Sequence, residues 1–433
     1  MKRLIYKKLQ KWKESNRRKP LILRGARQTG KTYILKEFGK NEYDNYVYLN
    51  FEESSDLTDL LSNNLPVEDV LRYISLYTGN KIVPGKTLLI FDEIQEAPII
   101  LQSLKYFYEK FREHHIIAAG SLLGIVLAGK ISFPVGKISF MDLYPLSFEE
   151  FLGALGQSNL LDIVPDKLDL VAPIPNVFHD KLIELLKIYY YVGGMPEVVA
   201  DYISNQDFNR VREIQLELID TYLNDFSKHT TKSEAIKIRQ IWNSISVHLA
   251  KENKSFIFSA IRSSARARDY EIALQWLLDA GLIYQIKNIS RPLFPLAAYV
   301  KSSFKVYLLD VGLLGAMTGL RVENIIVNDK LFSHFKGALV ENFVYQEISP
   351  YTTAYYWTTD GKAEVDLVVD IKGKIYPIEV KAGINLNAKS LNIYDKLFNP
   401  DILFRSSAAN FSKSQKKINI PLYAIKYFAT DNQ

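Results

Sequence analysis

The chain has 433 residues, a length that predicts about two to four domains rather than a single hydrophobic core. It lacks cysteine, which excludes disulfide bonds and cysteine-ligated metal or iron–sulfur sites, and we expect a cytoplasmic location. The net charge of +6 permits a DNA partner but does not require one.

The first residues, 1–12, combine basic and apolar side chains and predict an amphipathic helix rather than a signal peptide. No apolar run approaches membrane-spanning length, so we expect no membrane association. The histidines show no metal-ligand spacing; they are His114, His115, His179, His229, His248 and His334.

The most specific motif is the phosphate-binding loop pattern G-x-x-x-x-G-K-[ST], which residues 25–32 match as GARQTGKT. Residues 20–23 before it predict a short buried strand, and residues 33–38 after it predict the first turns of a helix. Glycines at both ends let successive backbone N–H groups point at one anion, and the helix adds the positive end of its dipole. The context makes a chance match improbable.

This loop predicts a site for a nucleotide and Mg²⁺. Lys31 would reach the β- and γ-phosphates, and Thr32 would offer a hydroxyl to the metal. The residues predicted to bind the nucleotide are Gly25, Ala26, Arg27, Gln28, Thr29, Gly30, Lys31, Thr32 and Tyr33.

A second motif completes the predicted site. The apolar run 87–91 reads as a central strand that ends in Asp92 and Glu93. Asp92 would hold Mg²⁺, and Glu93 would polarise the attacking water. Such a strand is common by itself, but downstream of a complete phosphate loop it supplies the second half of a nucleotide–metal site.

The first third of the chain alternates strand and helix, which predicts an α/β fold with a mainly parallel sheet. Further strands are expected at 45–51, 116–121 and 137–141, with a helix at 99–111. A strand between the two motifs, and a glutamate beside the metal aspartate, resemble the additional-strand, catalytic-glutamate division of phosphate-loop ATPases. Beyond this third, Ser147 and Glu150 have the spacing of a capping box.

The middle of the chain predicts helices and a winged helix. A helix over 179–191 ends at the Gly-Gly-Met-Pro sequence 193–196, and further helices follow over 209–254. A short helix at 255–261, a second at 269–279 and a strand from 282 suit a winged helix. Its basic residues Arg262, Arg266 and Arg268 would contact phosphates, although a solvated turn or a protein-binding role remains open.

The C-terminal part carries a different pattern. After a helix over 337–348, residues 363–369 and 375–381 alternate as a hairpin around 372–373. A two-residue turn would place Asp366 opposite Glu379, roughly 5 Å apart between Cβ atoms, where like charges need a cation between them. Lys381 would share that face and position or activate water, and Glu341 could add a carboxylate ligand.

This layout is that of a Mg²⁺-dependent phosphodiesterase, with Glu341, Asp366 and Glu379 as metal ligands and Asp366, Glu379 and Lys381 as catalytic groups. Two alternatives stay open: a charged hairpin face neutralised by Lys381, and a nuclease fold that no longer cuts. The two carboxylates on opposite faces of the sheet would remove the metal-site argument.

Together these features resemble the AAA-type ATPases of bacteria and archaea that carry a C-terminal restriction-endonuclease-like, PD-(D/E)xK, domain of unknown function. The markers are residues 25–32, 90–95, 119–121, 143–148, 193–196, 305–313, 337–341, 364–366 and 379–381. The resemblance implies ATP as the nucleotide and Ser121 as a catalytic polar sensor beside the γ-phosphate. Where the family has an arginine, this chain has Lys130, so an arginine-finger role there is in doubt and Arg27 is another candidate.

We therefore expect four domains: a phosphate-loop ATPase at 1–155, a helical linker or lid at 156–225, a winged helix at 226–320 and a restriction-endonuclease-like α/β domain at 321–433. The predicted function is a Mg²⁺-dependent ATPase, with Glu93, Lys31 and Ser121 as catalytic residues, coupled to a nuclease-like domain that acts on DNA. The alternative is a nucleotide-dependent switch or scaffold that binds DNA or protein without cleavage. A homo-oligomer or a protein partner is left open.

Overall fold

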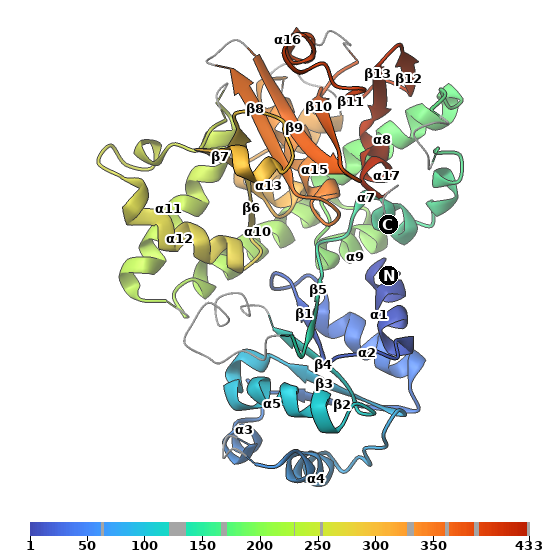
Figure 1. Cartoon of the computed structure of the whole chain (residues 1–433), viewed down its shortest axis with the longest axis vertical. Helices are drawn as coiled ribbons and strands as arrows, with labels where there is room; N and C mark the ends of the chain where they lie inside the picture. The colour runs from blue at the N-terminus through green and yellow to red at the C-terminus, as the bar shows by residue number, and fades with distance from the viewer. Residues whose placement is uncertain are drawn as a thin grey trace. The chain divides into compact units, whose positions relative to one another are not determined.

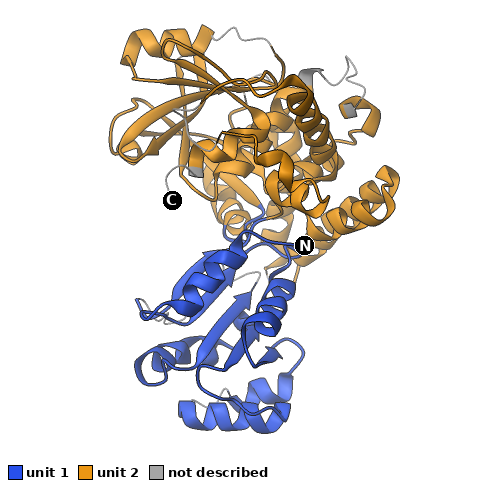
Figure 2. Cartoon of the chain, turned by 90° about the vertical axis from the view of Figure 1, so that its right-hand side faces the viewer, with its two compact units in different colours: residues 1–144, 279–282 blue, residues 145–278, 283–433 orange. Residues whose placement is uncertain are grey.

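A computed structural model describes residues 1–61, 65–120, 136–165, 171–228, 230–251, 254–326, 333–359, 363–384 and 389–430 (Figure 1). The chain divides into two compact units (Figure 2). Unit 1 comprises residues 1–144 and 279–282, and unit 2 comprises residues 145–278 and 283–433. Apart from residues 279–282, the predicted domains 156–225, 226–320 and 321–433 all lie within unit 2.

Unit 1 is an α/β fold built on a five-stranded parallel sheet. Its strands are β1 (Leu21–Arg24), β2 (Asn45–Asn50), β3 (Thr87–Asp92), β4 (His115–Gly120) and β5 (Ser139–Asp142), in the order β2-β3-β4-β1-β5. Its helices are α1 (Ile5–Glu14), α2 (Lys31–Glu42), α3 (Ser55–Leu61), α4 (Val67–Thr78) and α5 (Pro98–Lys110).

The strand order sets where the two nucleotide motifs meet. Strand β4 lies between β1 and β3, as expected for an additional-strand sheet, with Leu23 paired to Ala119 and Phe91 to Ala118. In a parallel sheet all carboxyl ends lie at one edge, so the loop after β1 and the acidic pair after β3 emerge on the same side. This arrangement confirms the predicted parallel sheet of the first third.

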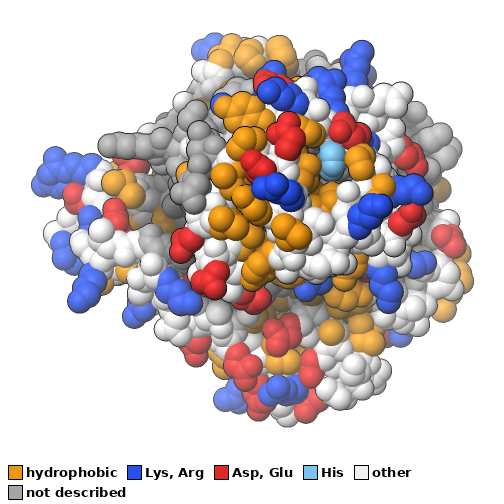
Figure 3. All heavy atoms as spheres, turned by 90° about the horizontal axis from the view of Figure 1, so that it is seen from below, with side chains coloured by type: hydrophobic (Ala, Val, Ile, Leu, Met, Phe, Trp, Pro, Cys, Tyr) orange, Lys and Arg blue, Asp and Glu red, His pale blue; other side chains and the backbone are white. Residues whose placement is uncertain are grey.

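Burial on both faces explains why these strands form. Every residue of β3 and β4 is buried, and the two faces are covered by separate hydrophobic clusters. Not all apolar side chains are inside: Leu60 of α3 and Leu76 and Tyr77 of α4 are exposed. The face of the molecule in Figure 3 likewise shows apolar side chains gathered between charged ones, as is common on globular proteins.

The helices of unit 2 include the predicted capped helix. Ser147 accepts a hydrogen bond from the Glu150 backbone N–H, and the Glu150 carboxylate accepts one from the Ser147 N–H, which confirms the capping box. The helices are α7 (Phe148–Ala154), α8 (Asn176–Val192), α9 (Pro196–Asn205), α10 (Phe208–Asp225), α11 (Lys232–Leu249), α12 (Ala267–Asp279), α13 (Val311–Met317), α14 (Val322–Ile326), α15 (Ser333–Ile348), α16 (Lys389–Phe398) and α17 (Ile425–Thr430).

Unit 2 also contains an eight-stranded mixed sheet in the order β12-β13-β11-β10-β9-β8-β6-β7. Its strands are β6 (Ile283–Ile289), β7 (Val300–Leu308), β8 (Ala354–Thr359), β9 (Ala363–Ile371), β10 (Lys374–Val380), β11 (Leu403–Ser407), β12 (Ser412–Ser414) and β13 (Lys417–Pro421). Figure 1 shows β8, β9 and β10 side by side in this sheet.

The predicted winged helix is not confirmed. The expected helix at 255–261 is only a short 3₁₀ turn at Phe258–Ala260, although α12 forms as expected. Strand β6 pairs antiparallel with β7 on one side and parallel with β8 on the other. The hairpin β6–β7 is therefore part of the large sheet, whereas the wing of a winged helix is a hairpin of a separate small domain.

In the part of the chain that the structure describes, no helix combines the length and apolar character needed to cross a bilayer.

Candidate functional site

The phosphate loop has the backbone conformation that its glycines permit. Gly25 has φ 155° and Gly30 has φ 91°, and Gln28 between them is also left-handed at φ 63°. A Cβ atom on Gly25 would lie 2.3 Å from the Leu143 carbonyl oxygen, so only glycine fits this turn. The buried Thr29 hydroxyl donates to the Ala26 carbonyl at 2.8 Å and holds the loop in shape.

Lys31 begins helix α2 directly after this loop. Its buried ammonium donates to the Gly25 and Ala26 carbonyls, each at 2.8 Å. Burial lowers the Lys31 pKa to about 8, although the carboxylates of Glu93 and Asp92 act in the opposite direction. The amides of the first helical turn have no acceptor within the helix, so anion-binding donors accompany the lysine.

Asp92, at the end of β3, is brought against the loop as predicted. Its Oδ2 accepts hydrogen bonds from the Thr32 hydroxyl at 2.6 Å and from the Tyr48 hydroxyl at 3.0 Å. Its Oδ1 accepts from the Glu93 N–H at 3.1 Å. Tyr48 was not predicted as a site residue, because its position on strand β2 beside β3 depends on long-range pairing.

Glu93 has an unusual backbone conformation, with φ 48° and ψ 46°. Left-handed geometry in a residue other than glycine is costly and frequent at functional sites. The Gln95 side-chain amide donates to Glu93 Oε2 at 2.5 Å, while Gln95 Oε1 is buried without a hydrogen-bond partner. Gln95 lies inside the marker 90–95, but no role was predicted for it. Two residues of the resemblance, Ser121 and Lys130, lie outside the described residues.

These groups fit a magnesium nucleotide. A left-handed glycine loop, a buried ammonium and a helix start are the donors that a triphosphate needs. The Thr32 hydroxyl and the Asp92 carboxylate, already in contact, are the oxygen ligands that Mg²⁺ prefers. All nine predicted nucleotide-binding residues fall in the loop and the first turn of α2.

The second predicted site, at the C-terminal hairpin, has a different geometry from the one expected. Strands β9 and β10 pair in the predicted register, from Ile371–Lys374 to Leu367–Ile378. The pairing of β9 with β8 is irregular, however. Tyr355 opposes Val368, but Trp357 opposes Val365, so two steps on β8 match three on β9 and a bulge lies at residues 366–367.

The bulge separates Asp366 from Glu379. Val365 and Val368 both lie in the hydrophobic cluster with Leu403, on one face of the sheet. Arg405, two residues beyond Leu403, shares this face, and Glu379 lies in register with Arg405 on the neighbouring strand.

Asp366 lies on the other face, near the side chains of Lys305 and Glu341, which dominate the charges that affect its pKa. The simple alternation used in the sequence analysis is therefore wrong at Asp366, and the two carboxylates do not share a face. Glu379 instead pairs with Lys381, whose Nζ lies 2.7 Å from Glu379 Oε1.

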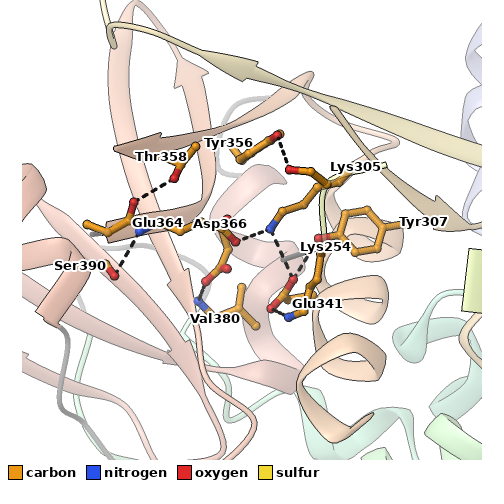
Figure 4. A network of polar contacts seen from close by, with 12 residues as sticks. Lys254, Lys305, Tyr307, Glu341, Tyr356, Thr358, Glu364, Asp366, Val380 and Ser390 are labelled. Atoms are coloured by element: carbon orange, nitrogen blue, oxygen red, sulfur yellow. Dashed lines mark hydrogen bonds and ion pairs between the residues drawn. The ribbon is translucent and has the colours of Figure 1, made fainter. Parts of the chain in front are cut away.

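Asp366 belongs to a polar network that Figure 4 shows in detail. Glu341 of α15 accepts hydrogen bonds from the Lys254 ammonium and, at 3.0 Å, from the Tyr307 hydroxyl. Lys305 Nζ lies 2.5 Å from Glu364 Oε1 and 3.8 Å from Glu341 Oε2. The Val380 N–H donates to Asp366 Oδ2 at 2.8 Å.

The charges in this network shift its pKa values. Burial raises the pKa of Asp366 to about 7, and the nearby Glu341 carboxylate acts in the same direction. Burial alone would raise the pKa of Glu341, but the ammonium groups of Lys254 and Lys305 bring this pKa below its ordinary value. Neither lysine was predicted as a site residue, and Lys305 in particular lies in strand β7, where a lysine is expected to be solvent-exposed.

A metal ion does not fit this second site. Glu341, Asp366 and Glu379 are not gathered around one point, because Glu379 lies on the other face. Within the described ranges, no group of three or more histidine, aspartate or glutamate side chains is arranged to hold a metal. The geometric case for the phosphodiesterase site is thus lost.

Three other marker segments have a structural role. Asp310 caps α13, accepting from the Leu313 N–H at 3.0 Å, and also accepts from the Gly194 N–H at 2.6 Å. The Leu146 N–H donates to the Gly194 carbonyl at 2.6 Å. Within unit 2 these contacts join Leu146, Gly194 and Asp310, which come from the marker segments 143–148, 193–196 and 305–313 respectively.

Comparisons with known families cover three parts of the chain. Residues 17–152 match an AAA domain, residues 183–324 a domain of unknown function (DUF8612), and residues 336–425 another domain of unknown function (DUF4143). No curated protein matches the chain significantly.

Several solved structures are similar to the chain. A Walker-type ATPase of Pyrococcus abyssi is 16% identical, with 72% of this chain and 94% of that chain covered and a TM-score of 0.45. AMPPCP-bound DnaA from Aquifex aeolicus is 16% identical, with 64% and 86% covered and a TM-score of 0.28. Cdc6p from Pyrobaculum aerophilum is 13% identical, with 71% and 88% covered and a TM-score of 0.24. At these TM-scores the similarities carry no argument about function.

The sequence match and the contacts described above both point to the same part of the chain. The match over 17–152, the phosphate-loop geometry and the strand order agree in giving this segment the character of an AAA domain with a phosphate loop.

Proposed function

We propose that unit 1 binds ATP with Mg²⁺ and hydrolyses it. The observation that carries this proposal is the contact between Thr32 and Asp92, 2.6 Å long, beside a buried lysine in a glycine-cradled loop. Each partner comes from a different motif, and each supplies an oxygen of the kind that Mg²⁺ takes as ligand. A purely structural hydrogen bond between these two side chains would not require the left-handed glycine loop.

The residues of the chain have distinct roles in this proposal. Lys31 and the amides of the first turn of α2 bind the phosphates, and Thr32 and Asp92 would hold the metal. Bound Mg²⁺ would neutralise charge that develops on the phosphates. Glu93 accepts a proton from the attacking water, and Gln95 fixes the orientation of its carboxylate through their 2.5 Å hydrogen bond.

We further propose that unit 2 is a nucleotide-regulated binding module for DNA or protein that does not cut its partner. The separation of Asp366 from Glu379 and the lysines beside Glu341 favour this version over an ATP-driven nuclease. The exposed residues Arg262, Arg266 and Arg268 are basic groups available to a nucleic-acid partner.

The test of the ATPase compares two variants of the full chain. Lys31→Ala should weaken ATP binding, whereas Glu93→Gln should bind ATP normally and hydrolyse it at least about a hundredfold more slowly, as loss of a general base predicts. Binding is measured by calorimetry and turnover by phosphate release. Equal hydrolysis by the wild type and Glu93→Gln would remove the assignment of the base.

The proposal for unit 2 has its own test. Wild-type protein with ATP and Mg²⁺ or Mn²⁺ should leave varied DNA and RNA substrates intact. Phosphate release measured with and without single- or double-stranded DNA then identifies the partner class, because a coupled partner changes turnover. Cleavage that is lost in Asp366→Ala would contradict the non-cutting version and restore the nuclease.

A further inference from the structure

The carboxylates on one face of the unit 2 sheet lie close together and need positive charge. Glu341 on α15 and Glu364 and Asp366 on β9 lie around the end of one side chain, that of Lys305 (Figure 4). Like charges held together in a protein interior repel strongly unless a cation lies between them. In many proteins a divalent metal has this role.

Lys305 occupies the central position in this cluster. It projects from β7, its side chain has no exposed surface, and its Nζ contacts Glu364 Oε1 at 2.5 Å and Glu341 Oε2 at 3.8 Å. The ammonium also lies 5.0 Å from the centroid of the Tyr356 ring, at a distance where an aromatic face attracts a cation. The same cluster raises the pKa of Lys305 despite its burial, so its positive charge is retained.

We infer that the Lys305 ammonium is the cation of this carboxylate cluster and occupies the position that a divalent metal ion would otherwise have. The cluster is therefore a structural centre that needs no metal.

Two observations separate this inference from a simple surface ion pair. Lys305 is wholly buried, so a metal could enter only if the ammonium left its carboxylates for an apolar interior, which is costly. A second ammonium, that of Lys254, also contacts Glu341, and the Tyr307 hydroxyl donates to the same carboxylate. The oxygens that a metal would need are thus already engaged by donors of the chain.

The inference predicts that removal of the lysine charge creates a metal site. Lys305→Met keeps most of the length and the apolar character of the stem but leaves the three carboxylates without their central cation. The variant should unfold at a lower temperature than its parent, and Mn²⁺ should raise its melting temperature. We expect a gain of about tenfold or more in Mn²⁺ affinity over the parent.

The experiment follows thermal unfolding and Mn²⁺ binding of the full chain without nucleotide. All proteins carry Asp92→Asn, which removes the proposed metal ligand of unit 1. The parent should show no Mn²⁺-dependent shift, and Lys305→Met should show one that Lys305→Met/Glu364→Gln loses. Lys381→Met, which removes an ammonium from the opposite face, serves as the matched control and should not gain Mn²⁺ binding.

Two results would overturn the inference. One is a Mn²⁺-dependent stabilisation of the parent that disappears in Glu341→Gln, since metal would then already occupy the cluster. The other is a folded Lys305→Met protein that is indifferent to Mn²⁺. If Lys305→Met does not fold, Lys305→Gln removes the charge but keeps a polar side chain, and Mn²⁺ should stabilise that variant; indifference there would also contradict the inference. Neither readout depends on ATP hydrolysis. The inference can therefore fail while the ATPase proposal holds, and the ATPase proposal can fail while the inference holds.

Discussion

Lys31 holds its ammonium against the carbonyls of its own loop, at 2.8 Å from both Gly25 and Ala26. The phosphates of a nucleotide must compete with these contacts. The contribution of Lys31 to binding is therefore the free energy of its contacts with phosphate minus that of its contacts with the two carbonyls. Because burial brings its pKa to about 8, the charge that binds the phosphates is also lost at mildly alkaline pH.

This charge loss gives a pH dependence with a defined sign. Below pH 8 the ammonium is present and affinity should be constant, whereas above pH 8 binding requires proton uptake and should weaken about tenfold per pH unit. Calorimetry with a non-hydrolysable ATP analogue at pH 7, 8 and 9 measures this. Lys31→Arg, which stays charged, should show no such slope. Equal wild-type affinity at pH 7 and pH 9 would contradict the role of the Lys31 charge.

Gln95 offers a prediction at the proposed general base. Gln95→Ala removes the donor to Glu93 Oε2, so the carboxylate loses its fixed orientation and turnover should fall about tenfold or more. ATP affinity should stay within about twofold, because Gln95 is not assigned a phosphate contact. The exposed neighbour Glu96 provides the control variant Glu96→Ala, which should behave as the wild type. A purely structural Gln95 would lower stability without a separate effect on turnover.

At the residue scale, the sequence was informative where chemistry is local. The loop 25–32 and the pair Asp92–Glu93 were predicted because short motifs fix both residue type and backbone path. Tyr48 and Lys305 were not, since each reaches its partner through pairing between distant strands. The bulge at Asp366 was also invisible, as one extra residue in a strand leaves the alternation of residue types almost unchanged.

At the element scale, close backbone contacts hold the helical part of unit 2 together. Helix α8 ends at Val192 and is followed by Gly193. The next residue, Gly194, accepts a hydrogen bond from the Leu146 N–H and donates its own N–H to the Asp310 carboxylate. A Cβ atom on Gly194 would lie 2.1 Å from the Leu146 carbonyl oxygen. The close packing around this marker therefore requires glycine, independently of nucleotide binding.

This contact predicts a steric effect on stability. Gly194→Ala should lower the free energy of unfolding by about 3 kcal/mol, at the upper end for overpacking, because the blocking atom is backbone and cannot rotate away. Gly153→Ala is the matched control, since nothing lies within 4 Å of its added Cβ and alanine favours the helix α7 in which it lies. Denaturant unfolding measures both, and equal stabilities would contradict the close packing at Gly194.

At the scale of the whole molecule, buried carboxyl groups with raised pKa values are concentrated in unit 2. Burial raises the pKa of Asp310 to about 6 and that of Glu347 to about 7. Glu347 accepts a hydrogen bond from the Phe148 N–H at 2.9 Å, and the charges near it are those of Lys426, Glu150 and Glu149. Such groups favour the folded state when they are protonated.

The stability of unit 2 should therefore fall as the pH rises. Since the folded pKa of Glu347 lies above its unfolded value, its contribution is complete below about pH 4 and is lost as the pH passes through about 7. Glu347→Gln keeps an acceptor for the Phe148 N–H but cannot titrate. Between pH 5 and pH 8 its free energy of unfolding should therefore fall by about 1–3 kcal/mol less than that of the wild type. Chemical denaturation at both pH values tests this, and identical losses would contradict it.

The large-scale organisation was the hardest to predict. The parallel sheet of unit 1 follows from alternating strand and helix patterns, and the C-terminal hairpin follows from its turn at Lys372–Gly373. The four expected domains assumed that β6 and β7 form a wing of their own. The ladder from Lys287–Tyr355 to Ile289–Trp357 pairs segments that are far apart in the chain. The local pattern of apolar and polar residues cannot predict such a partner strand.

That ladder has a practical consequence for attempts to study the C-terminal half in pieces. The two matched regions of unknown function, 183–324 and 336–425, contribute neighbouring strands to one sheet. A fragment cut between them would expose a row of unpaired amides and carbonyls along β6 in one piece and along β8 in the other. Open edges of this kind recruit foreign strands, so separately expressed fragments should aggregate, while their co-expression could restore a soluble heterodimer.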